Sequence, residues 1–302
     1  MKVLSLFDGI SCGMVALERA GIPVERYVAY EYDEKTSNVY PYAPYGIAAY
    51  VSSYNYPQIE HRGDVFKAEY NEGEFDLLIG GSPCTYWSVA RSDGKRETTS
   101  SGFGWELFMQ YVRALNEAKP KYFLYENNNS MSNLIKEEIT KQLGVEPIMI
   151  DSGLVSAQNR KRLYWTNIPN VTQPDDKGLC LQDIIELRDD YTYIPKEKLN
   201  NQTLRKNYLQ WDINGKGWKS QDQRAYFLNG KCGTLDTGCA HKHKLLIAND
   251  TVREFTHTEL ERLQTLPNGY TKCLSKSAAG KAIGTGWTVD VIAHIFRGLA
   301  QE

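Results

Sequence analysis

The first half of the chain alternates short apolar runs with amphipathic helical patterns, and this alternation restricts the possible folds most. Apolar runs of strand length occupy residues 3–7, 27–30, 75–79, 122–125, 147–150 and 163–165. Between two of them, apolar side chains at Leu107, Phe108, Tyr111, Val112 and Leu115 have the spacing of one helix face. Strands that alternate with helices form a parallel sheet with crossover helices. We therefore predict an α/β fold.

The alternation stops at about residue 166 and resumes near residue 256. The stretch between contains Pro169, Pro174 and Pro195 with many Asn and Gly residues, which favours a loop-rich insert. Thr256 and Glu259 then match a helix capping box, and a last amphipathic helix is expected over 289–299. The predicted division is 1–165 for the main domain, 166–252 for the insert and 253–302 for a return to the main domain.

Charge is distributed unevenly along this 302-residue chain. The net charge is −2, yet residues 196–244 hold eight Lys and two Arg against three Asp and one Glu, a local balance of +6. Such a segment is either a solvated face or a surface that contacts a phosphate backbone.

Composition also limits the location. No apolar run approaches the roughly 18 residues of a membrane span, and the N-terminus lacks the pattern of a signal peptide. Six irregularly spaced cysteines are typical of a reducing compartment, so we expect a cytoplasmic protein. The set Cys232, Cys239, His241 and His243 has no standard zinc spacing, and we expect no metal.

A Gly-Gly-Ser-Pro-Cys turn follows the apolar run at 75–79 and ends at Cys84. Glycines allow a sharp turn and proline stiffens it, which presents a cysteine where its thiolate could reach a bound substrate. The alternative is a small buried cysteine, which is the commoner role of this residue.

A glycine-containing turn at residues 7–13 leads from the first predicted strand into the first helix. Glu31 ends the second strand about 20 residues later, where an acid can hold ribose hydroxyls, and Asp64 follows a later strand. No Gly-Lys-Ser/Thr sequence follows the turn, so it is not a phosphate-binding loop, and an adenosine cofactor without a diphosphate fits better.

Polar residues flank two further strands. Glu126 ends the run at 122–125, although the following Asn-Asn-Asn-Ser sequence resembles a surface turn. Gln158, Arg160 and Arg162 precede or begin the run at 163–165, and strand alternation would place them on one face. Two arginines beside an acid suit contact with an oxyanion or a phosphate.

Taken in order, these blocks resemble the DNA (cytosine-5)-methyltransferase family. The matching sequences are SLFDGISCG, YEYD, GDV, GGSPC, YENN, QNRKRLYW, REFTHTELERLQTLPNGY and AIGTGWTVDVI, which span residue 3 to about 295. They are similar to the bacterial and phage type, with motif similarity to the animal de novo branch. The resemblance implies a Rossmann-like sheet that uses S-adenosyl-L-methionine, with residues 166–252 as a target-recognition domain.

The resemblance also implies catalytic roles. Cys84 would attack C6 of a flipped-out cytosine so that C5 can accept a methyl group. Glu126 would hold or protonate N3 of the base. Arg160 would face the base O2, and Arg162 would support the site.

Cofactor and DNA contacts follow from the same resemblance. The residues expected at the cofactor are Phe7, Asp8, Gly9, Ile10, Ser11, Glu31, Tyr32, Asp64, Val65, Pro83, Leu107, Thr285 and Gly286. Those expected at DNA are Ser88, Ala90, Arg91, Thr234 and Leu235, the first three in a mobile loop over residues 85–103. The implied partner is double-stranded DNA, bound by a monomer in a bacterial or phage-infected cell, with or without a cognate restriction enzyme.

Departures from the family pattern include three single positions. Thr85 stands where Gln or Asn is usual, Asn128 stands where Val is usual, and Thr285 stands where most bacterial members carry Asn. The sequence leaves three other functions open. These are a tRNA cytosine-5 methyltransferase, a catalytically silent DNA-binding module, and a thymidylate-synthase-like enzyme with the same attack on C6.

Overall fold

The computed structural model describes residues 1–37, 44–91, 94–188, 191, 193–195, 203–210, 223–236, 244–247 and 251–301. Two compact units divide the chain. Unit 1 comprises Met1–Asp151, Lys161–Gln173 and Val289–Glu302, and unit 2 comprises Ser152–Arg160 and Pro174–Thr288.

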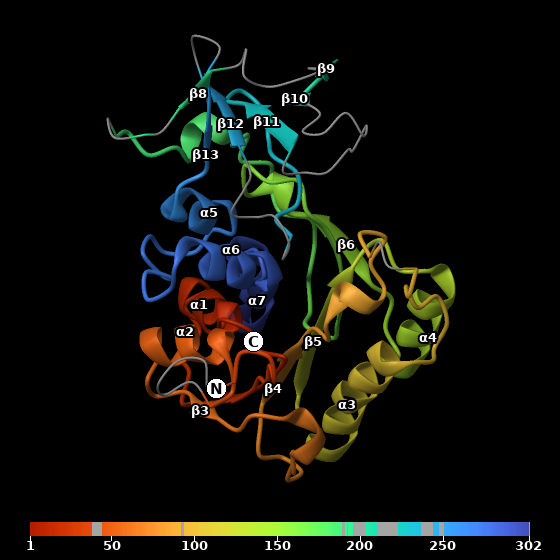
Figure 1. Ribbon diagram of the computed structural model, residues 1–302. Helices are drawn as coiled ribbons and strands as arrows, with labels where there is room; N and C mark the ends of the chain where they lie inside the picture. The colour runs from red at the N-terminus through yellow and green to blue at the C-terminus, as the bar shows by residue number, and fades with distance from the viewer. Residues whose placement is uncertain are drawn as a thin grey trace. The chain divides into compact units, whose positions relative to one another are not determined.

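Unit 1 is built on a seven-stranded sheet (Figure 1). Its strands are β1 (Lys2–Leu6), β2 (Arg26–Tyr30), β3 (Glu60–His61), β4 (Leu77–Gly80), β5 (Tyr122–Asn128), β6 (Ile148–Asp151) and β7 (Lys161–Thr166). The order across the sheet is β3-β2-β1-β4-β5-β7-β6, with β7 antiparallel to both of its neighbours and the other pairs parallel. The predicted α/β fold is confirmed.

The strand order reverses between β1 and β4. From β1 the chain proceeds outward to β2 and β3, then returns to add β4 and β5 on the other side. In open α/β sheets, ligands bind beside the carboxyl ends of the strands at such a reversal. Gly80 is needed where the two strands meet, because a Cβ there would lie 2.6 Å from the Leu6 carbonyl oxygen.

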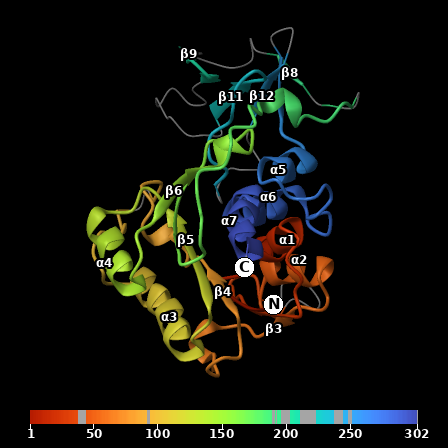
Figure 2. The same cartoon turned by 180° about the vertical axis from the view of Figure 1, so that it is seen from behind.

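Helices cover both faces of this sheet. In unit 1 they are α1 (Cys12–Arg19), α2 (Ile47–Asn55), α3 (Phe103–Ala118), α4 (Asn133–Leu143) and α7 (Val289–Phe296). Both views show α3 and α4 on one face and α1, α2 and α7 on the other (Figures 1 and 2). In the described part of the chain, no helix is long and apolar enough to cross a membrane.

The helix predicted from the 107–115 pattern is α3, and its apolar face closes the core. Phe108, Tyr111 and Val112 are buried against strand residues such as Leu78 and Tyr125. Burial of a large apolar side chain contributes about 1.5–3 kcal/mol, so this face alone anchors the helix.

The described residues of unit 2 form a second, six-stranded sheet and two α-helices. The strands are β8 (Ile194–Pro195), β9 (Thr203–Leu204), β10 (Tyr208–Gln210), β11 (Arg224–Phe227), β12 (Lys244–Ile247) and β13 (Thr251–Glu254), in the order β8-β13-β12-β11-β10-β9. The helices are α5 (His257–Leu263) and α6 (Lys276–Thr285), and the predicted capping box of Thr256 and Glu259 opens α5.

The division by contacts differs from the division drawn from the sequence. Residues 253–288, expected to return to the main domain, group with unit 2. Buried contacts of Glu259 on α5 explain part of this grouping. Its carboxylate accepts from the Glu186 amide at 2.9 Å and forms a bidentate ion pair with Arg253 of β13 at 2.6 and 2.7 Å. The limits 166 and 252, taken as the bounds of target recognition, stay a prediction.

Candidate active site

Cys84 lies on a turn at the carboxyl end of β4. After Gly80 the chain passes through Gly81, Ser82 and Pro83, and Cys84 begins a single 3₁₀ turn, Cys84–Tyr86. The Cys84 side chain is half-buried, so the thiol lies at the edge of the sheet rather than in the core. The turn thus places a thiol, the candidate nucleophile, beside the reversal in strand order, where ligands bind in open α/β sheets.

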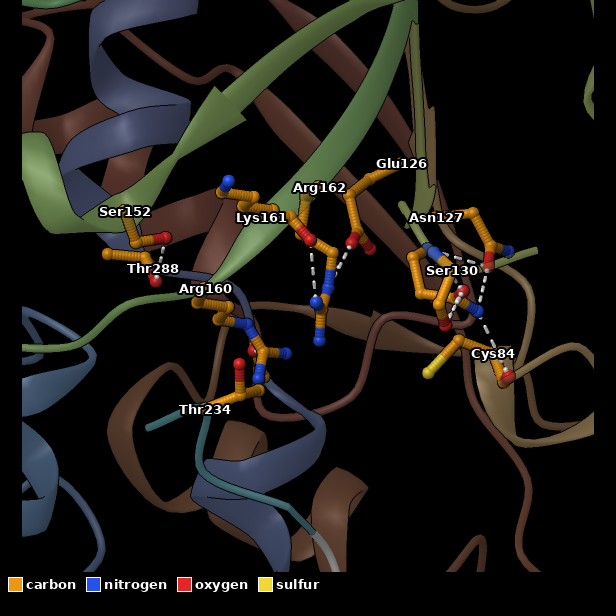
Figure 3. Close-up of polar contacts among 12 residues, drawn as sticks. Cys84, Glu126, Asn127, Ser130, Ser152, Arg160, Lys161, Arg162, Thr234 and Thr288 are labelled. Carbon is orange, nitrogen blue, oxygen red and sulfur yellow. Dashed lines mark hydrogen bonds and ion pairs between the residues drawn. The ribbon is translucent and has the colours of Figure 1, made fainter. Parts of the chain in front are cut away.

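Glu126 and Arg162 form an ion pair on the neighbouring strands (Figure 3). Glu126 Oε1 lies 3.0 Å from Arg162 Nε, and the two side chains are 11% and 12% exposed. In the pairing of β5 with β7, Arg162 is opposite Asn128 and Glu126 is opposite Tyr164, so the pair is a diagonal contact. Because β5 pairs directly with β4, Glu126 lies on the strand next to the one that leads into the Cys84 turn.

The expectation that Gln158, Arg160 and Arg162 share one strand face is wrong. Strand β7 begins at Lys161, and Gln158 instead forms an isolated bridge with Cys232 in unit 2. Regular alternation therefore does not extend back from Arg162 to the other two residues.

Arg160 is engaged inside unit 2. Its guanidinium donates to the carbonyl oxygens of Leu235 at 3.0 Å, Gly284 at 3.3 Å and Gly286 at 3.0 Å, and the residue is 4% exposed. These bonds join segments far apart in sequence, so Arg160 holds unit 2 together.

The asparagines after Glu126 are buried, so the Asn-Asn-Asn-Ser sequence is not simply a surface turn. Asn127 and Asn128 are 0% and 4% exposed because β5 continues to Asn128. Asn127 Nδ2 donates to the Ser82 carbonyl at 3.1 Å and to the Tyr125 hydroxyl at 3.1 Å. The sequence did not predict that Tyr125 and Asn127 hold the Cys84 turn. The available signal was the apolar run at 122–125, which could have been extended as a strand through Asn127.

The turn after β1 has an unusual backbone. Phe7 and Ser11 have φ angles of 57° and 58°, in the left-handed region that L residues rarely adopt, and Gly9 has φ 61°. Nothing lies within 4 Å of the position of a Cβ on Gly9, so the backbone there faces open space. Strained backbone of this kind concentrates at ligand-binding turns.

Glu31 is tied to that turn. The Gly9 amide donates to Glu31 Oε2 at 2.9 Å. Burial raises the pKa of Glu31 to about 7, and the negative charges of Asp8 and Asp33 add smaller increases. The hydrogen bond from Gly9 lowers the pKa but does not cancel these effects. A ligand hydroxyl that donates to the carboxylate would relieve this unfavourable burial.

Asp8 turns its carboxylate inward. Its Oδ1 accepts from the Ser5 hydroxyl at 2.6 Å and the Tyr27 hydroxyl at 2.7 Å, and its Oδ2 accepts from Ser11. Burial raises the pKa of Asp8 even though these bonds oppose the shift. The Asp8 and Ser11 side chains therefore brace the turn, and the Ile10 side chain is fully buried beside them.

The other predicted cofactor residues fall in both units. In unit 1, Val65 and Leu107 are buried, Tyr32 and Pro83 are exposed, and Asp64 Oδ1 accepts from the Phe66 amide. Thr285 and Gly286 belong to unit 2, where Thr285 donates to the Ala282 carbonyl and Gly286 accepts from Arg160.

The loop after Cys84 is fastened at its base. Trp87 is fully buried, and its indole donates to Glu97 Oε2 at 3.1 Å. The other oxygen of Glu97 accepts from the Gly104 amide at 3.2 Å, at the start of α3. Three predicted DNA contacts lie on the loop between these points: Ser88 and Arg91 are half-buried, Ala90 is exposed, and the Arg91 guanidinium lies 5.3 Å from the Tyr86 ring centroid.

The two DNA candidates of unit 2 have internal contacts. Thr234 donates to the Asn159 carbonyl at 2.9 Å, and Leu235 is fully buried with its amide bonded to Gln158 Oε1. Cys239, His241 and His243 lie outside the described residues, as does most of the basic segment, and burial raises the pKa of the Cys232 thiol above its usual range.

Comparisons with known proteins agree with this architecture. The family model for C-5 cytosine-specific DNA methylase matches residues 1–301. The orphan methyltransferase M.Rho11sI of Bacillus phage rho11s is 29% identical over 70% of this chain and 41% of its own length. The type II methyltransferase M.NgoPII of Neisseria gonorrhoeae is 26% identical over 89% of this chain and 86% of its own length.

A solved structure confirms the fold independently. The Dnmt2 methyltransferase of S. pombe, 16% identical, superposes with a TM-score of 0.66 over 98% of this chain and 97% of that chain. The chain spans about two fifths of the length of the phage relatives that it matches. With the family model matched over nearly every residue, the chain belongs to the C-5 cytosine-specific DNA methylase family.

Proposed function

We propose that this protein transfers a methyl group from S-adenosyl-L-methionine to C5 of cytosine in double-stranded DNA. The observation that carries the proposal is the Glu126–Arg162 pair on the strands beside the Cys84 turn. A carboxylate next to a guanidinium offers an acceptor and a donor, which complements the amino, N3 and O2 edge of cytosine. Family membership supports the same substrate.

In this proposal Cys84 is the nucleophile. Its thiolate forms a bond to C6 of cytosine, which breaks the aromatic system and makes C5 electron-rich. After C5 carries the methyl group, loss of the C5 proton and expulsion of the thiolate restore the ring. Because C6 is stacked inside a duplex, the base must first be flipped out of the helix.

Glu126 and Arg162 would stabilise the base as charge develops on it. The Glu126 carboxyl would hold or protonate N3, and a guanidinium would face O2. We assign the second role to Arg162 rather than Arg160. Among the described residues, Arg162 Nη2 has no hydrogen-bond partner, whereas both terminal nitrogens of Arg160 are bonded to carbonyl oxygens of unit 2.

The turn after β1 fits the cofactor. Open space in front of Gly9 would admit the methionine portion, and the half-buried Glu31 carboxylate would accept from the ribose hydroxyls. Ile10 and the Asp8–Ser11 pair would shape the turn. The remainder of the cofactor site would be lined by Phe7, Tyr32, Asp64, Val65, Pro83 and Leu107. When bound, S-adenosyl-L-methionine supplies an electrophilic methyl group. Thr285 and Gly286 are proposed to contribute from unit 2.

DNA contact would come from both units. Ser88, Ala90 and Arg91 are proposed to approach the space left by the flipped base, and Thr234 with the backbone of Leu235 to lie near the target. The bacterial and phage relatives support action in the cytoplasm of a bacterial or phage-infected cell. Action by a monomer is proposed from the family resemblance alone. The type II name of one relative supports a cognate restriction enzyme as partner.

The test is methyl transfer from labelled S-adenosyl-L-methionine to mixed-sequence duplex DNA, with base-resolution mapping and a parallel tRNA arm. We expect label at cytosine C5 in DNA at one short sequence. Label only in tRNA would overturn the substrate, and bound cofactor without label in either would favour a silent DNA-binding module.

A cysteine variant tests the nucleophile. Cys84→Ser should bind cofactor and DNA yet transfer no methyl group, whereas Cys273→Ser, which alters a partly buried thiol in unit 2, should retain transfer. Near-normal turnover by Cys84→Ser would refute the covalent mechanism.

A further inference from the structure

We propose that Asn128 is a positioning residue that holds the Cys84 turn and, through Ser130, joins it to the base of the loop that follows. The inference rests on the proposed function only for its catalytic consequence. The hydrogen bonds that link the three segments are present whatever the substrate.

The Asn128 amide bonds with both of its polar atoms inside the protein. Nδ2 donates to the Cys84 carbonyl at 3.2 Å and to Asn127 Oδ1 at 3.2 Å. Oδ1 accepts from the Ser130 amide at 3.0 Å and the Ser130 hydroxyl at 2.8 Å. A side chain that is 4% exposed and bonded on all sides is held in one orientation.

The contact with Cys84 fixes a short turn to the sheet. The Cys84 carbonyl accepts from the Trp87 amide at 3.1 Å and the Ser88 amide at 3.0 Å, which are bonds within its own turn. Asn128 adds a donor that comes from β5 instead. Since Glu126 stands two residues earlier on the same strand, one strand end positions both the acid and the nucleophile.

Ser130 extends the link to the loop after Cys84. Its hydroxyl accepts from the Val89 amide at 3.4 Å, and its carbonyl accepts from Arg96 Nη2 at 2.5 Å. Arg96 Nε also donates to the Trp87 carbonyl at 3.0 Å. The turn after β5 therefore contacts the chain on both sides of the loop tip.

A valine at position 128, which is usual in the family pattern, could form none of the side-chain hydrogen bonds of Asn128. Asn128→Val would leave the Ser130 amide and hydroxyl without their acceptor and would detach the Cys84 carbonyl from β5. A displacement of about 1 Å at a reacting group costs up to roughly a hundredfold in rate. We expect the single-turnover rate of methyl transfer to fall about tenfold, with the Kd for S-adenosyl-L-methionine unchanged within about twofold. The reason is that only Pro83 among the proposed cofactor residues adjoins Cys84, whereas the turn that would hold the cofactor follows β1.

The matched control is Asn129→Val, which makes the same change at the exposed neighbouring position. A second variant, Ser130→Ala, removes the hydroxyl bonds to Asn128 and Val89 and should cause a smaller loss. If the residues act as one unit, the double variant should be no slower than Asn128→Val alone, which independent structural damage would not produce.

A readout without catalysis separates this inference from the proposed function. Peptide-level hydrogen exchange over residues 84–91 should be several-fold faster in Asn128→Val than in the wild type, and unchanged in Asn129→Val. If the wild type transfers no methyl group, the proposed function fails, while faster exchange would still support the link. Unchanged exchange, or a single-turnover rate within twofold of an active wild type, would overturn the positioning role.

Discussion

Replacing the half-buried acid Glu31 by its neutral isostere should stabilise the protein and weaken cofactor binding. Burial raises the Glu31 pKa from 4.5 to about 7. Each pKa unit corresponds to about 1.36 kcal/mol, so ionisation of Glu31 lowers the stability of the folded state by roughly 3 kcal/mol. Because the side chain is partly exposed, solvent screening reduces this penalty to about 2 kcal/mol.

The sign of the pH dependence follows from the direction of the shift. Below pH 4.5 Glu31 is protonated in both states and carries no penalty. Between pH 4.5 and about 7 the unfolded chain ionises while the folded one still binds the proton, so the stability of the wild type falls as pH rises. Above that window the penalty is constant.

Urea unfolding of the wild type and Glu31→Gln from pH 4.5 to 8 measures this effect. The stability gained by Glu31→Gln should grow by about 2–3 kcal/mol across the window, on top of any constant offset from an unsatisfied amide hydrogen. Glu34→Gln, an exposed neighbour, should show no such growth. A Glu31→Gln difference that stays flat with pH would refute the reasoning.

The same variant tests the cofactor assignment. The neutral amide is a weaker acceptor than a carboxylate, and a charge-assisted hydrogen bond contributes about 1.5–3 kcal/mol. We expect calorimetry to show S-adenosyl-L-methionine bound about 10- to 100-fold more weakly by Glu31→Gln. Equal affinity would remove Glu31 from the proposed site.

Three arginine substitutions separate chemistry from structure. Arg162→Lys should lower kcat for methyl transfer about a hundredfold or more with little change in Tm, since a lysine cannot reproduce the guanidinium geometry; a kcat within threefold would contradict its place at O2. Arg160→Met should lower the free energy of unfolding by about 3 kcal/mol, because three hydrogen bonds from a buried guanidinium are lost, and an unchanged Tm would contradict this. Arg253→Met should cost about 3–5 kcal/mol, because Glu259 would remain buried and unpaired; denaturant unfolding at pH 8 measures it, and a loss under 1 kcal/mol would show that the pair is dispensable.

Local pattern predicted the elements of unit 1 well. Apolar runs at 3–7, 27–30 and 122–125 are strands β1, β2 and β5, and the spacing at 107–115 is helix α3. Such signals depend on neighbouring residues alone, since the side-chain period of a strand or helix repeats within one or two turns. The capping box at Thr256 is equally local and is confirmed.

Partner choice could not be predicted in the same way. The sequence places Arg160 and Arg162 two residues apart with the same side chain. Because β7 begins at Lys161, Arg162 lies on the strand and pairs with Glu126. Arg160 lies outside it and donates to the carbonyl oxygens of Leu235 and Gly286. A strand end is set by its pairing with another strand, which is a long-range contact.

By itself, the amino-acid sequence determined the α/β fold, the order of the motifs and the candidate nucleophile Cys84. The tertiary structure alone decided that Asn127 and Asn128 are buried, that Glu31 is held beside Gly9, and that 253–288 group with unit 2. Asparagine favours turns on its own, and its burial here is tolerated because the turn after β4 supplies carbonyl acceptors for the Asn127 and Asn128 amides. Local propensity decides what a segment is, whereas contacts across many residues decide what its side chains do.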